Sequence, residues 1–181
     1  TYPHIGNYGV NREDVEASRV HAAGLIIKDL PVRVSNFRQS QTLSDYLVAE
    51  GTVAIADIDT RRLTRVLRNT GAQNGCIATF AAGYQVSDAD KADAIARAKA
   101  APNMAGQDLA QVVTTAAPFE WTQTEWKLAR EDGTPGYGEL TSPRFHVVAY
   151  DFGVKHNILR MLATRGCRVT VVPATTSAEE A

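Results

Sequence analysis

The strongest constraint on the fold is a pattern of two apolar runs separated by a helical spacing near the end of the chain. Phe145–Tyr150 is a nearly continuous apolar run, and Arg168–Val172 is a second run of the same kind. Between them, apolar residues recur at helical spacing from Ile158 to Leu162, and Gly166 follows as a stop. Buried strands on both sides of a helix form a βαβ unit with parallel strands. The sequence therefore predicts the start of a parallel α/β sheet here.

A second strand followed by a helix is predicted in the middle of the chain. Val53, Ile55 and Ile58 form a short apolar run rich in β-branched residues, which is typical of a buried strand. Either Asp59 or Thr60 can cap the following helix, because its side-chain oxygen can accept a hydrogen bond from a free N–H in the first turn.

The predicted helix has an apolar face and a clear end. Leu63, Val66 and Leu67 recur at helical spacing. Gly71 is placed to end the helix in the left-handed conformation. Asn74–Phe80 is then expected to form another strand.

The same helix carries four arginines, Arg61, Arg62, Arg65 and Arg68. Three of them are spaced three or four residues apart and share a face, which Arg62 flanks. One interpretation is a solvated face with a few ion pairs. The other is a basic surface that docks an acidic patch on a partner protein. The sequence leaves both interpretations open.

Several shorter elements are predicted elsewhere. They are a strand at Gly24–Lys28, a helix around Leu43–Leu47, an alanine-rich helix capped by Ser87 and Asp90 and running to about Ala101, a short helix at Asp108–Val113, a strand-like stretch at Phe119–Trp126, and a helix start at Ser177–Glu180. Ala129–Pro143 is rich in Gly, Pro and charge and is predicted to be a linker. We therefore expect a domain over residues 1–128, a linker over 129–143 and the beginning of a second domain over 144–181.

Composition excludes several classes of protein. The net charge of −1 gives no bulk attraction to nucleic acid or to an anionic membrane, and no apolar span is long enough to cross a bilayer. The two cysteines, Cys76 and Cys167, are predicted to be free thiols rather than a structural pair, which fits a reducing cytoplasm. We expect a cytoplasmic protein that contacts neither nucleic acid nor membrane.

Several motifs together resemble one protein family. They are A-D-I-D-T-R-R-L-T-R-V-L-R at Ala56–Arg68, G-A-Q-N-G-C-I at Gly71–Ile77, T-Y-P-H-I-G-N-Y-G at Thr1–Gly9, S-N-F-R at Ser35–Arg38 and F-H-V-V-A-Y-D-F-G-V-K-H-N-I-L-R at Phe145–Arg160. These motifs, and their order along the chain, resemble the small, glutamine-using subunit of the carbamoyl-phosphate synthase family. The resemblance covers nearly the whole chain and is weakest between residues 81 and 138.

The resemblance implies an α/β fold and a function for a longer parent protein. The fold would be a mixed α/β N-terminal domain followed by the first βαβ unit of a flavodoxin-like class I amidotransferase domain, truncated in this chain. The parent would hydrolyse glutamine and pass ammonia to a large subunit, which makes carbamoyl phosphate from bicarbonate for arginine and pyrimidine synthesis. ATP and magnesium are expected on that large subunit, and this chain is expected to hold no cofactor and no metal.

The catalytic residues of the family are not expected within this chain. The family's nucleophile is a cysteine in a G-x-C-x-G-x-Q turn, activated by a histidine that a glutamate orients. Neither Cys76 nor Cys167 lies in such a sequence. The resemblance implies that Cys, His and Glu lie beyond Ala181 and that a glutamine-contacting serine precedes Thr1. The chain alone is therefore predicted to be inactive.

Other candidate sites receive weaker support. Asp151-Phe152-Gly153 lacks the other kinase motifs and is predicted to be a turn from strand to helix. Lys155 and His156 lie near the end of a predicted strand, where α/β sheets bind ligands, so they are candidates for lining a site. His4, His21 and His146 have no metal-binding spacing. Asp57 and Asp59 are expected to serve in a turn and a cap.

Two alternatives remain at this stage. One is another class I amidotransferase, such as those of anthranilate or guanylate synthesis. The other is a noncatalytic scaffold that has lost the nucleophile. Identifying the residue in the G-x-C-x-G-x-Q turn of the complete protein would decide the second alternative.

Overall fold

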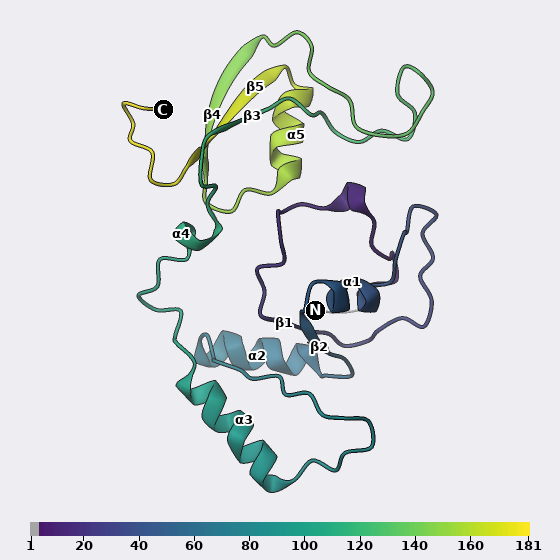
Figure 1. Ribbon diagram of the computed structural model, residues 1–181, viewed down its shortest axis with the longest axis vertical. Helices are drawn as coiled ribbons and strands as arrows, with labels where there is room; N and C mark the ends of the chain where they lie inside the picture. The colour runs from purple at the N-terminus through teal and green to yellow at the C-terminus, as the bar shows by residue number, and fades with distance from the viewer. Residues whose placement is uncertain (1–3) are drawn as a thin grey trace. The chain divides into compact units, whose positions relative to one another are not determined.

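The two predicted strand–helix patterns fall in different units of the structure. The computed structural model describes residues 4–181 (Figure 1). One unit contains the described residues up to Arg12 together with Val20–Gln107, and the other contains Glu13–Arg19 and Asp108–Ala181. The chain thus passes briefly into the second unit, returns to the first, and completes the second at its end.

The second unit is built on the predicted βαβ arrangement. β4 (Phe145–Asp151) and β5 (Cys167–Pro173) pair in parallel along their whole length, and α5 (His156–Thr164) joins them. This confirms the parallel strands expected from the apolar runs. β3 (Phe119–Trp121) pairs antiparallel with the other side of β5, which gives the strand order β3-β5-β4. A short helix, α4 (Ala110–Val113), precedes β3.

The core of this unit lies between α5 and one face of the sheet. Leu159 of α5 packs against Cys167, Val169 and Val171 of β5, and Leu159, Val169 and Val171 have no exposed surface. Burial alternates over the first part of β5, where Arg168 between Cys167 and Val169 is exposed, whereas Val171 and Val172 are both buried. The period of two expected for a strand is therefore clear at the start of β5 and is lost at its end.

The pairing of β3 places residues 108–128 with the C-terminal unit. The compact units therefore divide near Gln107 rather than in the predicted linker over 129–143. Trp126 lies outside β3, although it was expected in a strand-like stretch. The assignment of residues 144–181 to an amidotransferase domain stays a prediction.

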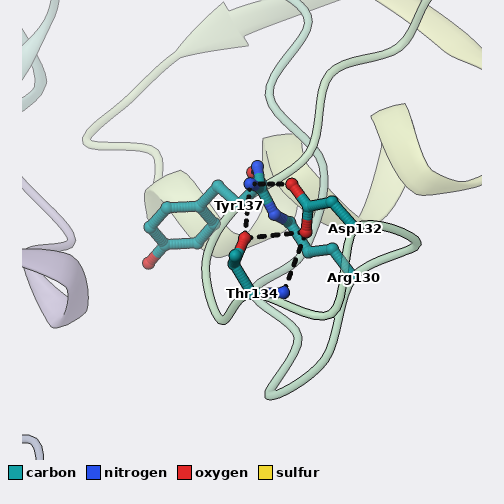
Figure 2. A network of polar contacts seen from close by, with 4 residues as sticks. All are labelled: Arg130, Asp132, Thr134 and Tyr137. Carbon is teal, nitrogen blue, oxygen red and sulfur yellow. Dashed lines mark hydrogen bonds and ion pairs between the residues drawn. The ribbon is translucent and has the colours of Figure 1, made fainter.

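The predicted linker contains an ordered hairpin. Antiparallel bridges join Gln123 to Glu139 and Lys127 to Gly136. At the tip, the guanidinium of Arg130 donates to the Asp132 carboxylate at 2.7 Å and to the Thr134 hydroxyl at 2.8 Å (Figure 2).

Asp132 closes the tip of this hairpin. Its carboxylate accepts hydrogen bonds from the hydroxyl and the backbone N–H of Thr134, and these bonds lower the pKa of Asp132. Gly133 occupies the turn with φ 77°, a conformation that favours glycine. Local polar side chains, rather than an apolar core, order this segment.

The first unit contains a small sheet and most of the helices. β1 (Gly24–Ile26) and β2 (Val53–Ile55) form a two-stranded parallel sheet. The helices are α1 (Leu43–Ala49), α2 (Thr60–Thr70) and α3 (Asp88–Ala100), and a 3-10 turn, η1, covers Arg12–Asp14 where the chain passes to the second unit. The elements predicted at residues 24–28, 43–47 and 87–101 are confirmed, with ends that differ by one or two residues.

The helix caps follow the sequence closely. Of the two candidate caps for α2, Asp59 serves: its carboxylate accepts from the Arg62 N–H at 2.9 Å, and Gly71 ends the helix with φ 82°. Ser87 and Asp90 form a capping box at the start of α3. The Ser87 hydroxyl and backbone N–H donate to Asp90 and lower the pKa of that carboxyl group.

The burial expected in this unit is wrong. β2 forms, but Val53 is 37% exposed and Ile55 is 39% exposed, because a sheet of two three-residue strands offers little surface to cover them. The apolar face of α2 is also partly open, with Val66 44% exposed. The helical period correctly predicted which residues share a face of α2. It did not predict whether other residues pack over that face.

Two predicted elements are absent from the described residues. Asn74–Phe80 forms no strand, because it pairs with neither β1 nor β2, although Ile77 packs closely over Gly24. Ser177–Glu180 forms a turn rather than a helix. The Glu180 carboxylate accepts from the backbone N–H and the hydroxyl of Ser177, so the capping contact forms without the helix.

Candidate functional site

The predicted partner surface lies on α2. Arg61, Arg62, Arg65 and Arg68 are all exposed. Within residues 4–181, none of these four side chains makes a hydrogen bond or an ion pair. The surface is solvated, as the first interpretation expected, but the few ion pairs of that interpretation do not form among the described residues. The four guanidinium groups are available to a ligand or a partner.

Apolar side chains border the arginines. Val66 is 44% exposed and Leu67 is 38% exposed on the same helix. Arginine beside exposed aliphatic residues is typical of protein–protein interfaces, where apolar contact supplies affinity and arginine is enriched. The composition of this surface suits a protein partner with acidic groups.

The second candidate region is the carboxyl end of β4, where the chain turns into α5. The buried carboxylate of Asp151 accepts hydrogen bonds from the N–H groups of Gly153 at 2.9 Å and Val154 at 2.8 Å. It also accepts from the N–H of Thr115 at 2.6 Å. The D-F-G sequence is therefore a strand-to-helix turn organised by its aspartate, as predicted.

The two candidate site residues after this turn are placed differently. Lys155 stands exposed at the start of α5. The His156 ring lies 5.1 Å from the Trp121 ring and packs against it. Packing accounts for His156, whereas Lys155 remains a candidate for lining a site at this edge of the sheet.

A buried arginine that the sequence reasoning missed lies one turn further along α5. Arg160 is 5% exposed, and its Nε donates to the Gln123 side chain at 2.9 Å. Its guanidinium lies 4.2 Å from the centre of the Tyr137 ring, and its Nη1 lies 3.6 Å from Oε1 of Glu16. These partners are distant in sequence, so no local motif marks the cluster. One sign was available in the sequence: lysine is a poor capping residue, so Lys155 at the start of the helix indicates that the cap must come from another part of the chain.

The cysteines form no nucleophile turn in the part of the chain that the structure describes. Cys167 is buried at the start of β5, Cys76 is half-buried in an extended segment, and both are free thiols. The described residues also contain no group of three or more His, Cys, Asp or Glu side chains that could hold a metal. No helix among them has the length and apolar character needed to span a bilayer.

Sequence comparison finds a matching family and similar proteins that share the same name. Residues 1–77 match the family described as carbamoyl-phosphate synthase small chain, CPSase domain. The carbamoyl phosphate synthase small chain of Rubrivivax gelatinosus is 70% identical over 180 residues, which cover 99% of this chain and 46% of that protein.

Two further relatives have the same name. The one from Ralstonia nicotianae is 62% identical over 181 residues, covering 100% of this chain and 45% of that protein. The one from Pasteurella multocida is 58% identical over 180 residues, covering 99% and 44%. The chain thus spans about half the length of the curated relatives it matches.

Proposed function

We propose a function on the premise that this chain is a homologue of carbamoyl phosphate synthase small chains, to which it is 58–70% identical in three cases. The complete protein is then the glutamine-hydrolysing subunit of such a synthase. The observation that carries this proposal is the 70% identity over 180 residues, which includes both units of the structure.

The proposed chemistry divides between two chains. The small chain attacks the side-chain amide of glutamine with a cysteine thiolate, which forms a glutamyl thioester and releases ammonia, and water then hydrolyses the thioester to glutamate and the free cysteine. A large chain that binds ATP and magnesium takes the ammonia and bicarbonate and makes carbamoyl phosphate for arginine and pyrimidine synthesis. In this scheme residues 4–181 supply scaffold and docking surface, since they hold no cysteine in a nucleophile turn. The proposed location is the cytoplasm.

The two alternatives differ in their support. Identity of 58–70% across the chain to proteins of one name favours the synthase over other class I amidotransferases. A noncatalytic scaffold would share the same two units and differ at the nucleophile.

The decisive experiment uses the complete protein with its large chain. The gene is first read beyond codon 181 for a G-x-C-x-G-x-Q turn. Carbamoyl phosphate formation from bicarbonate and ATP is then measured with glutamine or ammonia as the nitrogen source. We expect activity with both sources, and loss of the glutamine-dependent activity alone when the cysteine of that turn is changed to serine. Activity with ammonia but not with glutamine in the unmodified complex would contradict the proposal.

The 181-residue chain provides a second test. Because the proposed nucleophile lies outside it, the purified chain should release no ammonia from glutamine. Measurable turnover would overturn the placement of the catalytic residues.

The α2 surface is proposed as one contact with the large chain. Its four exposed arginines carry no internal partner within residues 4–181, so an acidic patch on the large chain can pair with them. Changing Arg61→Glu together with Arg65→Glu should weaken the complex by roughly tenfold or more, as expected when like charges are brought together across an interface. The measurement is isothermal titration calorimetry at low and high salt.

A control variant makes the same change in net charge outside α2. Lys99→Glu with Lys127→Glu also reverses two exposed cations, one on α3 and one in the hairpin. This variant should bind the large chain nearly as well as the unmodified protein. Equal loss in both variants, or no loss in the arginine variant, would remove α2 from the interface.

A further inference from the structure

Helix α5 begins without a cap from its own neighbours. The first N–H groups of an α-helix have no partner within the helix and usually bond to a Ser, Thr, Asp or Asn side chain just before it. Lys155 occupies that position in α5 and makes no such hydrogen bond with its side chain. The donors at the start of α5 must therefore be satisfied from elsewhere.

Glu16, 140 residues earlier in the chain, supplies the missing acceptors. Its backbone carbonyl accepts from the His156 N–H at 3.2 Å, and its Oε2 accepts from the Asn157 N–H at 2.8 Å. Glu16 belongs to the same compact unit as α5. A carboxylate at this end of a helix is also favoured by the helix dipole.

The same carboxylate faces the buried arginine. Oε1 of Glu16 lies 3.6 Å from Nη1 of Arg160, whose side chain is 6% exposed. Gln123 and the Tyr137 ring hold that guanidinium in place. A cation this deeply buried needs an anionic partner, and removal of the partner would leave it uncompensated.

A second contact fixes the preceding part of the segment. The hydroxyl of Tyr137 donates to the backbone carbonyl of Glu13. Burial raises the pKa of Tyr137, so the hydroxyl keeps the proton that it donates at neutral pH. The segment Glu13–Arg19 is thus attached at Glu13 through its backbone and at Glu16 through backbone and side chain.

We propose that Glu13–Arg19 is a strap that caps α5 from a distant part of the same chain, with Glu16 as the positioning residue. Asp151 fixes the turn that leaves β4, and Glu16 fixes the helix that follows it. This is the edge of the sheet at which α/β proteins bind ligands. The strap therefore holds in place the edge of the sheet where a ligand would bind, although it lies far from that edge in the sequence. This proposal does not depend on the function proposed above.

Two arginines at the ends of the strap make the proposal testable in the complete protein. Trypsin cleaves after arginine, and Arg12 and Arg19 are both exposed. Because a protease must bind several residues around the cleaved bond in an extended form, release of the strap should accelerate cleavage at both sites. In Glu16→Ala we expect cleavage at these two sites, and hydrogen exchange at the amides of residues 156–158, to rise roughly tenfold, the size of a lost helix cap. A cleavage rate and exchange rate equal to those of the unmodified protein would overturn the proposal.

A matched control removes an exposed carboxylate from the same unit. Glu179→Ala changes the charge by the same amount at an exposed position after β5, and it should leave both rates unchanged. An equal rise in this variant would show that the effect does not depend on the strap, which contradicts the proposal.

A milder variant keeps the proposal testable if Glu16→Ala fails to fold. Glu16→Gln retains an acceptor for the Asn157 N–H but loses the charge facing Arg160. We expect cleavage after Arg19 to increase by at least about threefold, because the buried Arg160 loses its anionic partner, and by less than for alanine, because the cap is kept. No increase in Glu16→Gln would overturn the role of the Glu16–Arg160 pair in holding the strap.

Discussion

The two units of this chain bury their apolar residues to very different extents. In the second unit, Leu159, Val169 and Val171 are completely buried between α5 and the sheet. Among the described residues of the first unit, Ile27 alone is a buried hydrophobic residue, while Val53 and Ile55 are more than a third exposed. The cause is geometric: seven-residue strands with a helix across them enclose a core, and three-residue strands do not.

The match to the family model and the best-packed core lie in different parts of the chain. The family match over residues 1–77 lies almost entirely in the less buried unit. The matched region includes α2, whose arginines point to solvent rather than to a core. The matched region therefore includes an exposed basic helix, which is consistent with the docking role proposed for it.

The largest effect on stability is expected from the core of the second unit. Leu159→Ala should lower the free energy of unfolding by about 3 kcal/mol, because it removes a fully buried side chain and leaves a cavity. Leu67→Ala on α2 is the matched control and should cost less than about 1 kcal/mol, because Leu67 is already 38% exposed. Urea unfolding of the second unit is followed by tryptophan fluorescence, since Trp121 and Trp126 both belong to it, and unfolding of the first unit is followed by the circular dichroism of its helices. Equal costs at the two positions would break the comparison between the units.

A somewhat smaller loss is expected at the turn after β4. Asp151→Ala leaves three N–H groups without their acceptor, and we expect a cost of about 2 kcal/mol in the same urea titration. Asp29→Ala, which removes an exposed carboxylate in the first unit, should change stability by less than about 0.5 kcal/mol. If Asp151→Ala is as mild as Asp29→Ala, the turn does not depend on its aspartate.

The cap of α3 should matter less and only locally. Ser87→Ala removes the acceptor for the Asp90 N–H and should destabilise the start of α3 by about 1 kcal/mol. Hydrogen exchange of the α3 amides should increase while that of α5 amides does not. A change that spreads to α5 would show that the two units respond together.

Acid should weaken the same cap. Because hydrogen bonds from Ser87 lower the pKa of Asp90, the ionised carboxylate stabilises α3 fully above its ordinary pKa of 3.8. This contribution is lost as the pH falls through the lower pKa of the folded state. We expect exchange protection at the start of α3, compared at matched intrinsic rates, to fall below about pH 4 in the unmodified protein and to be insensitive to this step in Asp90→Asn. An identical pH response in the two proteins would contradict this assignment.

The smallest effect on stability is expected from the arginine surface. Arg61→Glu with Arg65→Glu should shift the free energy of unfolding by less than about 0.5 kcal/mol, because neither side chain has a partner within residues 4–181. Thermal unfolding by circular dichroism measures this directly. A large loss would mean that the arginines serve the fold of the first unit rather than a surface contact.

Local sequence rules predicted much of this structure. Capping by Asp59 and Ser87, the stop at Gly71 and the parallel β4–α5–β5 unit are all confirmed, because each depends on neighbouring residues or on a clear apolar period. The resemblance to carbamoyl-phosphate synthase small chains is confirmed by identity of up to 70% over 180 residues. That resemblance was inferred from the motifs and their order along the chain, which do not depend on how the residues pack.

Features that depend on distant segments were not predictable in the same way. Asn74–Phe80 has the composition of a strand, but a strand also needs a paired neighbour, and this segment pairs with neither β1 nor β2. The Gly- and Pro-rich stretch around Gly133 reads as a linker, although Arg130, Asp132 and Thr134 order it as a hairpin. Glu16 gave no local sign of its role, because its partners lie in α5.

The course of the chain through the second unit also has a consequence for genetics and for protein engineering. Since Glu13–Arg19 precedes Val20–Gln107 in sequence, a gene cut at any single codon leaves one product without part of its own unit. A product that begins at Asp108 would lack Glu16 and could recover the cap of α5 only from an added peptide or a grafted segment. An insertion or fusion that preserves the order of the whole chain keeps the strap, whereas separation of the two units as independent genes requires that the strap be rebuilt.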